Sequence, residues 1–366
     1  MKNFLLKKSK PKTPADLVRE ARDLLISCVN NNNNFASFAQ KFKPKKNVAE
    51  SIGKIMLQLK LTLYGTPDCE PIPKDCAELS KEFFNSNTLR LLIDALPKLH
   101  QDTRTDSTHV VMNLLKRKLG NSLIGCDYLE ANLDIVDILV KGYEKNKETG
   151  ALHNSAILKE CIRYQCVAKY ILDSKPGGIE LFFAYIQIPD YEIAADATET
   201  FKLLLTRHKS TVAGFLSENF EWFFAGYNAK LLESANYVTR RQAVKLLEVI
   251  LVDRSNSNVM ARHLSSKENL RLVMNILREP GMGLKVDAFN VFKLFVRYEK
   301  KPTCIVNILV ANRSKLIKLI LEDLRMDKKG ADNDLLEADK SSIVKELATL
   351  GTNVGTKVSP SVGVVF

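Results

Sequence analysis

The sequence is short of the residues that build turns and of the long apolar runs that build membrane spans. It has 16 glycines and 12 prolines among 366 residues, whereas turn-rich β architectures use both at regular intervals. No window approaches the roughly 18 apolar residues of a spanning helix, and the Phe-Leu-Leu run near the start is too short for a signal-peptide core. These absences favour a helical protein with no membrane partner, which we expect to be cytoplasmic with access to the nucleus.

Paired cysteines are also missing. The seven cysteines are an odd number and contain no Cys-x-x-Cys pair. No histidine or second cysteine stands near them at zinc-finger spacing. We therefore interpret them as small apolar residues of a protein in a reducing compartment.

Motifs that carry catalysis or hold a cofactor are absent as well. The sequence has no phosphate-binding Gly-x-x-x-x-Gly-Lys, no Gly-x-Gly-x-x-Gly after a strand, no His-Glu-x-x-His and no Gly-x-Ser-x-Gly. The acidic stretch 327–337 lacks the ligand spacing of a calcium loop. We expect no enzyme activity, no cofactor, no catalytic residue and no bound metal, calcium included.

The positive charge is concentrated near the start of the chain. The net charge is +12, but residues 1–50 carry +7 of it and the remaining 316 residues carry +5. A nucleic-acid reader usually concentrates basic residues on its folded binding surface. The charge therefore argues only weakly for nucleic acid, and we expect no nucleic-acid partner.

What the sequence does contain is helical periodicity along most of its length. Thr13, Pro14 and Asp16 are typical of a helix start, and the asparagines at 30–34 favour a loop. Nothing alternates with period two for long enough to indicate a strand. The expected helices cover residues 47–64, 76–85, 88–97, 107–119, 128–143, 152–172, 190–208, 210–227, 236–253, 268–278, 284–298 and 304–325.

An internal repeat organises these helices. Segments 196–203, 242–249 and 287–294 align without gaps, and their alanines lie 46 and 45 residues apart. Related segments near residues 156 and 110 continue the series upstream at 41 and 46 residues. This is the period of armadillo and HEAT repeats, which stack because one unit cannot bury its own apolar face. We predict an all-α, armadillo/HEAT-like helical-repeat solenoid over residues 1–350.

Within that single solenoid we expect four minor divisions. Residues 1–29 form a basic segment and the first helix, and residues 30–34 form an asparagine-rich loop. A capping helix closes the solenoid at about 341–350, and residues 351–366, which show no periodicity, form a flexible tail.

The helix 236–253 separates a core side from a possible binding side. At 100° per residue, Ala243, Leu246, Leu247 and Ile250 share one face. A stripe roughly opposite is formed by Tyr237, Arg241, Lys245, Glu248 and Val252. Tyrosine and arginine dominate protein-binding hot spots, so this stripe is a candidate partner surface. A merely solvated helix face is the alternative.

Several of these strings resemble the calcium-binding protein 39 family, also known as mouse protein 25-like scaffolds. The resemblance rests on KTPADLV at 12–18, YEIAADA at 191–197, NYVTRRQ at 236–242, LVDR at 251–254, KENLRLVMN at 267–275 and DAFNVFK at 287–293. It spans about residues 1–350 and is strongest over 150–325.

The resemblance implies a rod-like, horseshoe-shaped scaffold without catalytic activity. Such scaffolds bind sterile-twenty-like kinases and related pseudokinases on their concave face, and they favour the active kinase conformation. A pocket near the C-terminal end takes a Trp-Glu-Phe-type tail of the pseudokinase. By motif match, Arg241 and Met274 belong to that tail pocket, while Tyr237, Lys245 and Arg254 belong to neighbouring contacts. Many members carry an aromatic residue shortly after the Asp-Arg pair, where this chain has Ser255-Asn256-Ser257-Asn258.

Two other functions compete with this hypothesis. A generic helical-repeat adaptor for acidic peptides would differ only in its partner. An RNA-binding solenoid would present base-reading side chains at equivalent positions of every repeat. The position of Arg241 is instead Ala195 in the preceding repeat and Val286 in the next, which disfavours RNA.

Overall fold

The computed structural model describes residues 12–30, 45–118, 120, 122–144, 150–174, 178–324 and 331–351. The expected basic segment before residue 12, loop residues 31–34 and tail residues 352–366 lie outside these ranges. The chain divides into two compact units, Met1–Arg207 and His208–Phe366, and each is described by itself. The predicted all-α class is confirmed, because the regular elements of the described residues are helices, and the bridge between Thr66 and Cys69 is isolated rather than part of a strand.

The first unit contains a series of long helices joined by pairs of short ones. Its elements are α1 (Pro14–Asn30), α2 (Lys45–Tyr64), α3 (Pro73–Asn85), α4 (Thr88–Ala95), η1 (Leu96–Lys98), α5 (Gln101–Lys116), α6 (Ile124–Ala131), α7 (Asp134–Val140), η2 (Lys141–Glu144), α8 (Ala151–Cys161), α9 (Gln165–Asp173), η4 (Ile179–Leu181), α10 (Phe182–Tyr185) and α11 (Tyr191–Thr206).

The second unit repeats the same plan. Its elements are α12 (Lys209–Glu218), α13 (Phe220–Tyr227), η5 (Asn228–Leu232), α14 (Tyr237–Val252), η6 (Arg254–Asn256), α15 (Ser257–Leu264), α16 (Lys267–Ile276), α17 (Met282–Arg297), α18 (Thr303–Ala311), α19 (Arg313–Lys318), η7 (Leu319–Asp323) and α20 (Ala331–Thr349). The elements η5 and η7 are π-helical turns.

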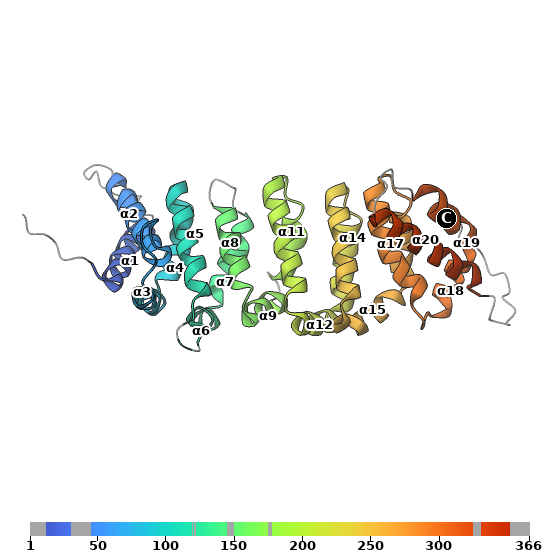
Figure 1. Cartoon of the computed structure of the whole chain (residues 1–366), viewed down its shortest axis with the longest axis horizontal. Helices are drawn as coiled ribbons and strands as arrows, with labels where there is room; N and C mark the ends of the chain where they lie inside the picture. Colours follow the sequence, from blue (N-terminus) through green and yellow to red (C-terminus); the bar gives the residue numbers. More distant parts are fainter. Residues whose placement is uncertain are drawn as a thin grey trace, which may run out of the picture. The chain divides into compact units, whose positions relative to one another are not determined.

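Long helices pack beside the next long helix within each unit (Figure 1). In the first unit the series is α2, α5, α8 and α11, and in the second it is α14, α17 and α20. The three aligned sequence segments lie in α11, α14 and α17, and their alanines are all buried. The predicted helical-repeat solenoid is thus confirmed at the level of its repeating unit. No helix in the described part of the chain is long and apolar enough to cross a bilayer.

The core forms where one long helix buries its apolar side. On α14 the predicted core residues Ala243, Leu246, Leu247 and Ile250 are at most 6% exposed. On α17, Phe289, Phe292 and Phe295 are fully buried. Burying one such side chain contributes about 1.5–3 kcal/mol, so these residues hold neighbouring helices together.

Ion pairs connect successive long helices along their solvent side. In the first unit, Lys60 of α2 pairs with Asp106 of α5 at 2.7 Å, and Lys159 of α8 pairs with Asp196 of α11 at 2.6 Å. Lys116 of α5 pairs with Glu160 of α8 at 3.4 Å. In the second unit the pairs include Arg241 with Asp287 at 2.8 Å and Lys293 with Asp339 at 2.6 Å.

Four expected helices are each divided in two, and in three of them asparagine is the reason. Asn132, Asn219 and Asn312 interrupt the patterns expected over 128–143, 210–227 and 304–325. Each side-chain amide donates to the carbonyl four residues earlier, at 2.8, 3.0 and 2.9 Å. This local bond competes with continuation of the helix.

Other elements also differ from the expected ones, and α5 begins at Gln101 rather than at residue 107. The helix expected over 152–172 turns at residues 162–164. The helix α15 was not expected at all, and the capping helix expected at about 341–350 is the end of the longer α20. Element ends depend on tertiary contacts that periodicity does not report.

A buried histidine makes the stability of the second unit depend on pH. His263 is 1% exposed, and its ring lies 5.0 Å from that of Phe224 and 6.1 Å from that of Phe295. The Asn269 amide is 3.1 Å from Nδ1. Burial lowers the pKa of His263 from 6.5 to about 3, because the charged imidazolium loses its hydration.

Acid should therefore destabilise the second unit before most carboxylates titrate. The folded pKa lies below the unfolded one, so the stabilisation is complete above pH 6.5 and is lost as the pH falls towards 3. The free energy of unfolding should begin to fall near pH 6.5, and its slope should reach about 1.4 kcal/mol per pH unit by about pH 5.5. Urea unfolding followed by circular dichroism measures this slope. His263→Gln should flatten it, and an equal slope in both proteins would contradict the assignment.

Candidate functional site

The candidate stripe begins at the first residue of α14. Asn236 caps this helix, and its side-chain oxygen accepts from the backbone N–H groups of Val238 and Thr239. The cap places Tyr237 in the first turn, where its side chain is 39% exposed. Lys245, two turns further on, is also exposed. The predicted stripe residues of α14 thus lie away from the buried face.

Arg241 is held in a fixed position by the next long helix. Its Nε donates to Oδ2 of Asp287 at 2.8 Å, and the Asp287 side chain is only 12% exposed. This hydrogen bond raises the pKa of Arg241 above its usual value. The Arg241 side chain remains 40% exposed, so Asp287 orients it without removing it from solvent.

Glycines at the start of α17 make room for both side chains. A Cβ atom on Gly283 would lie 2.7 Å from Cζ of Arg241, and a Cβ atom on Gly281 would lie 3.0 Å from the ring of Tyr237. Real Cβ atoms essentially never approach other atoms as closely as 2.7 Å. The sequence Gly281-Met282-Gly283 therefore lets α17 approach α14 at the candidate site.

Arg254 lies beyond the other end of α14, in the short η6. It is exposed, and Asp253 before it accepts from the backbone N–H of Ser255 at 2.9 Å. Lys209 and this N–H group lower the pKa of Asp253. Within Ser255–Asn258, Asn256 is buried and donates to the carbonyl of Ile250 at 2.8 Å. An amide thus ties this turn to α14.

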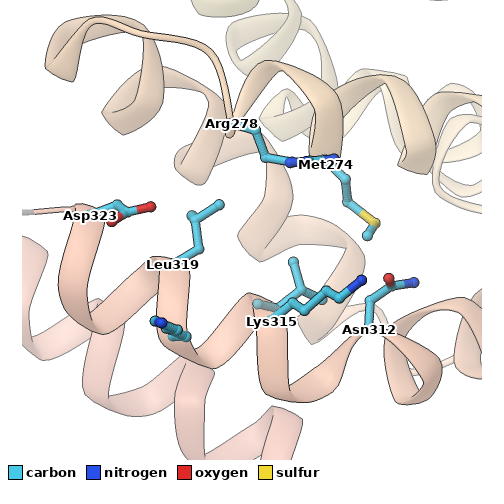
Figure 2. Close-up of a pocket in the computed structure, with 8 residues that line it drawn as sticks. Met274, Arg278, Asn312, Lys315, Leu319 and Asp323 are labelled. Carbon is cyan, nitrogen blue, oxygen red and sulfur yellow. The ribbon is translucent and has the colours of Figure 1, made fainter. Parts of the chain in front are cut away.

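Met274 lies in a different place, on the wall of a pocket between α16 and the segment from the end of α18 to η7 (Figure 2). The pocket holds about 280 Å³, and Met274 is 4% exposed. Its apolar wall is formed by Met274, Leu316 and Leu319. This combination suits an apolar side chain that inserts from solvent.

Charged groups surround this apolar wall. Arg278, Lys315 and Lys318 contribute cations, and Asp323 contributes one carboxylate. Lys318 also lies 3.8 Å from Glu322, whereas no described residue is within ion-pair distance of Arg278 or Lys315. Two cations are therefore available, within the described part of the chain, to an acidic ligand.

The π-helical turn η7 forms one side of the pocket, and a lysine of α20 bonds to the residue that follows it. Leu319 and Asp323 are its first and last residues. Lys340 of α20, 3% exposed, donates through Nζ to the carbonyl of Leu324 at 2.7 Å and pairs with Glu337 at 2.7 Å. A buried ammonium group thus ties the end of η7 to α20.

The structure brings together some of the predicted site residues and separates others. Tyr237, Arg241 and Lys245 share the solvent side of α14. Met274 lines the pocket, whereas Arg241 is absent from its lining. The assignment of both residues to one tail pocket is untested by this geometry and stays a prediction.

Sequence reasoning did not identify the pocket cations. Lys315 and Lys318 are three residues apart, which places them near each other on a helix. That spacing was available as a signal, but it is common on any solvated helix. The π-helical turn that completes the pocket has no sequence signature, although such turns often occur at functional sites. Among the described residues, no group of three or more His, Cys, Asp or Glu could hold a metal ion.

Comparison with known proteins places this geometry in a family. The family model described as Mo25-like matches residues 4–351. A putative MO25-like protein of Arabidopsis thaliana is 51% identical over 343 residues, which cover 94% of this chain and 97% of the relative. The mouse protein named calcium-binding protein 39-like is 35% identical over 350 residues, covering 96% and 98%. The Mo25-like protein of Schizosaccharomyces pombe is 35% identical over 348 residues, covering 95% and 100%.

These matches confirm the resemblance drawn from the sequence strings. They support a non-catalytic, scaffold-type role. With a family model along nearly its whole length and relatives above 30% identity over most of theirs, the chain belongs to the Mo25-like family.

Proposed function

We propose that this protein is a cytoplasmic scaffold that binds a sterile-twenty-like kinase or pseudokinase and promotes kinase signalling. The class of partner follows from the family resemblance. The structural observation that carries the proposal is the apolar pocket beside Met274 with its rim of cations. A tail of the Trp-Glu-Phe type combines aromatic rings with an acidic group, which matches that chemistry.

The pocket would take the tail through two kinds of contact. Met274 offers a polarisable thioether to an aromatic ring, and Leu319 lies opposite it (Figure 2). Arg278 and Lys315 would bind the acidic group as charge-assisted hydrogen-bond donors. At about 280 Å³ the pocket is small for a drug-sized ligand, so it suits one or two side chains of a short peptide.

The solvent side of α14 would contact the body of the kinase. Asp287 uses only Nε of Arg241, so the Nη groups retain donors for a partner carboxylate. The exposed Tyr237 ring adds an apolar contact beside it. Lys245 and Arg254 extend this surface along and beyond the same helix.

Such a scaffold would act by preferring one conformation of the kinase. A ligand shifts a conformational equilibrium only by its difference in affinity for the two states. A preference of about 1.4 kcal/mol for the active-like state would shift the equilibrium tenfold. No catalytic group of the scaffold is needed for this effect.

Affinity purification followed by a kinase assay tests the proposal directly. We expect the protein to capture a sterile-twenty-like kinase or pseudokinase, and the captured kinase to be more active with the scaffold than after its removal. Capture of other proteins without such a kinase would instead support the generic peptide adaptor. Binding to a random RNA pool at physiological salt would support the RNA-binding alternative.

The tail assignment is tested by Arg241→Ala combined with Met274→Ala. This double variant should abolish the pull-down of a peptide ending in Trp-Glu-Phe, with helical circular dichroism unchanged. Of these two residues only Met274 lines the pocket. The two single variants therefore show which of them contacts the peptide. Unchanged binding in the double variant would contradict the assignment.

A charge reversal separates the pocket rim from general electrostatic attraction. Lys315→Glu should weaken binding of the same peptide at least tenfold, since it replaces a rim cation by an anion. Lys345→Glu is the matched control, because Lys345 is exposed on α20 and does not line the pocket. Equal losses in both variants would show attraction by net charge alone.

The glycine beside Arg241 gives a test of the α14 surface that leaves Arg241 itself intact. Gly283→Ala should displace the guanidinium, because the new Cβ would lie 2.7 Å from its Cζ. We expect weaker binding of the purified kinase, measured by surface plasmon resonance, and weaker binding of the tail peptide as well if Arg241 belongs to the tail pocket.

Gly214→Ala is the control for this substitution. Gly214 also lies in a helix, and nothing stands within 4 Å of a Cβ placed there. This change should leave both affinities unaltered and favour the helix by up to about 1 kcal/mol. If Gly283→Ala behaved like Gly214→Ala, the orientation of Arg241 would not matter for kinase binding.

A further inference from the structure

Two cysteines from consecutive repeats of the first unit face each other. Cys126 lies in α6 and Cys166 in α9, and their Sγ atoms are 3.8 Å apart although the residues are 40 positions apart in sequence. Both side chains are half-buried. Spacing along the chain gave no sign of this pair, because it is created by the stacking of repeats.

The surrounding packing holds the two sulfur atoms in this position. Tyr164, immediately before α9, donates its hydroxyl to the carbonyl of Leu115. A Cβ atom on Gly125, the neighbour of Cys126, would lie 2.9 Å from that hydroxyl oxygen. The start of α6 is therefore packed closely against the turn that leads into α9, and Cys126 follows Gly125 directly while Cys166 comes two residues after Tyr164.

The distance suits bond formation after a small movement. A disulfide has an S–S length of about 2.05 Å, so the sulfur atoms need to approach by about 1.8 Å. Side-chain rotation about χ1 moves a sulfur atom by this order of distance. Half-burial leaves the pair accessible to a small oxidant while hindering a bulky one.

We propose that Cys126 and Cys166 are an oxidation site, at which hydrogen peroxide forms a reversible disulfide between consecutive repeats. Peroxide first converts one thiol to a sulfenic acid and releases one water molecule. The sulfur of the second thiol then attacks the sulfenic sulfur, the S–S bond forms, and a second water molecule leaves. The two thiols lose two protons and two electrons in total, and these reduce one peroxide to two waters.

The disulfide would join the short helices of two neighbouring repeats. The loop it closes contains α7 and α8, and α8 carries Lys159, which pairs with Asp196 of α11. Closing a long loop restricts the unfolded chain and so stabilises the folded one. Oxidation should therefore stiffen the first unit, and a thiol reductant should reverse the effect.

Mass spectrometry of the full-length chain tests the proposal. The background is Cys69→Ser with Cys304→Ser, since these exposed thiols would otherwise cross-link separate molecules. After treatment with hydrogen peroxide we expect a mass loss of about 2 Da, a cross-linked peptide containing Cys126 and Cys166, and loss of alkylation at both. Dithiothreitol should restore all three, and the midpoint of thermal unfolding should be higher in the oxidised protein.

Matched variants make the result decisive. Cys126→Ser and Cys166→Ser, each in the same background, should abolish the mass loss and the rise in unfolding midpoint while preserving circular dichroism. Cys28, also half-buried, should stay open to alkylation throughout. Retained alkylation of Cys126 and Cys166 after peroxide, a cross-link through the fully buried Cys161, or oxidation to sulfinic acid without a cross-link would each overturn the proposal.

Discussion

A long helix in this protein has more apolar surface than its own repeat can cover, and the rest of the fold depends on that constraint. Phe289, Phe292 and Phe295 of α17 are fully buried only because neighbouring helices pack on them. Half-exposed ion pairs on the opposite side contribute much less, about 0–1 kcal/mol each. Burial therefore supplies the stability, whereas pairs such as Arg241 with Asp287 define how far one helix is shifted along the next.

The same packing explains why the candidate surfaces are so different in character. Each long helix packs one of its sides into the core. Its solvent-exposed side therefore presents only a row of separate side chains, such as Tyr237, Arg241 and Lys245. A pocket needs a gap between elements, and one arises where η7 departs from regular α-helix beside α16. The second unit thus offers two kinds of surface. The exposed side of α14 provides a row of side chains for a broad contact, and the turn η7 provides a pocket for one inserted side chain.

The sequence predicted the elements that depend on local pattern. Its repeat located α11, α14 and α17 to within two residues at most ends, because burial on one side imposes a period of 3.6 residues. It failed where a single side chain acts against the pattern, as Asn132, Asn219 and Asn312 do by bonding to the carbonyl one turn back.

Site prediction shows the same division. The exposed side of α14 follows from helix geometry, so Tyr237 and Lys245 could be placed on it in advance. The pocket cations Arg278 and Lys315 could not, since Arg278 lies in the turn after α16 and Lys315 lies in α19, more than thirty residues further along the chain. Nor could the approach of Gly283 to Arg241, which depends on how closely two helices pack.

Because of Lys340, the structure of the pocket depends on α20, the last described helix. A buried ammonium group is tolerated only when its bonds are satisfied, and here they go to the Leu324 carbonyl and the Glu337 carboxylate. If α20 separated from η7, the carbonyl that ends the π-helical turn would lose its donor and the ammonium would return to water. Binding of a ligand to the pocket and folding of α20 are therefore thermodynamically linked. A ligand that binds the formed pocket also stabilises α20. A truncation that removes α20 lowers the affinity for that ligand, although it removes none of the residues that line the pocket.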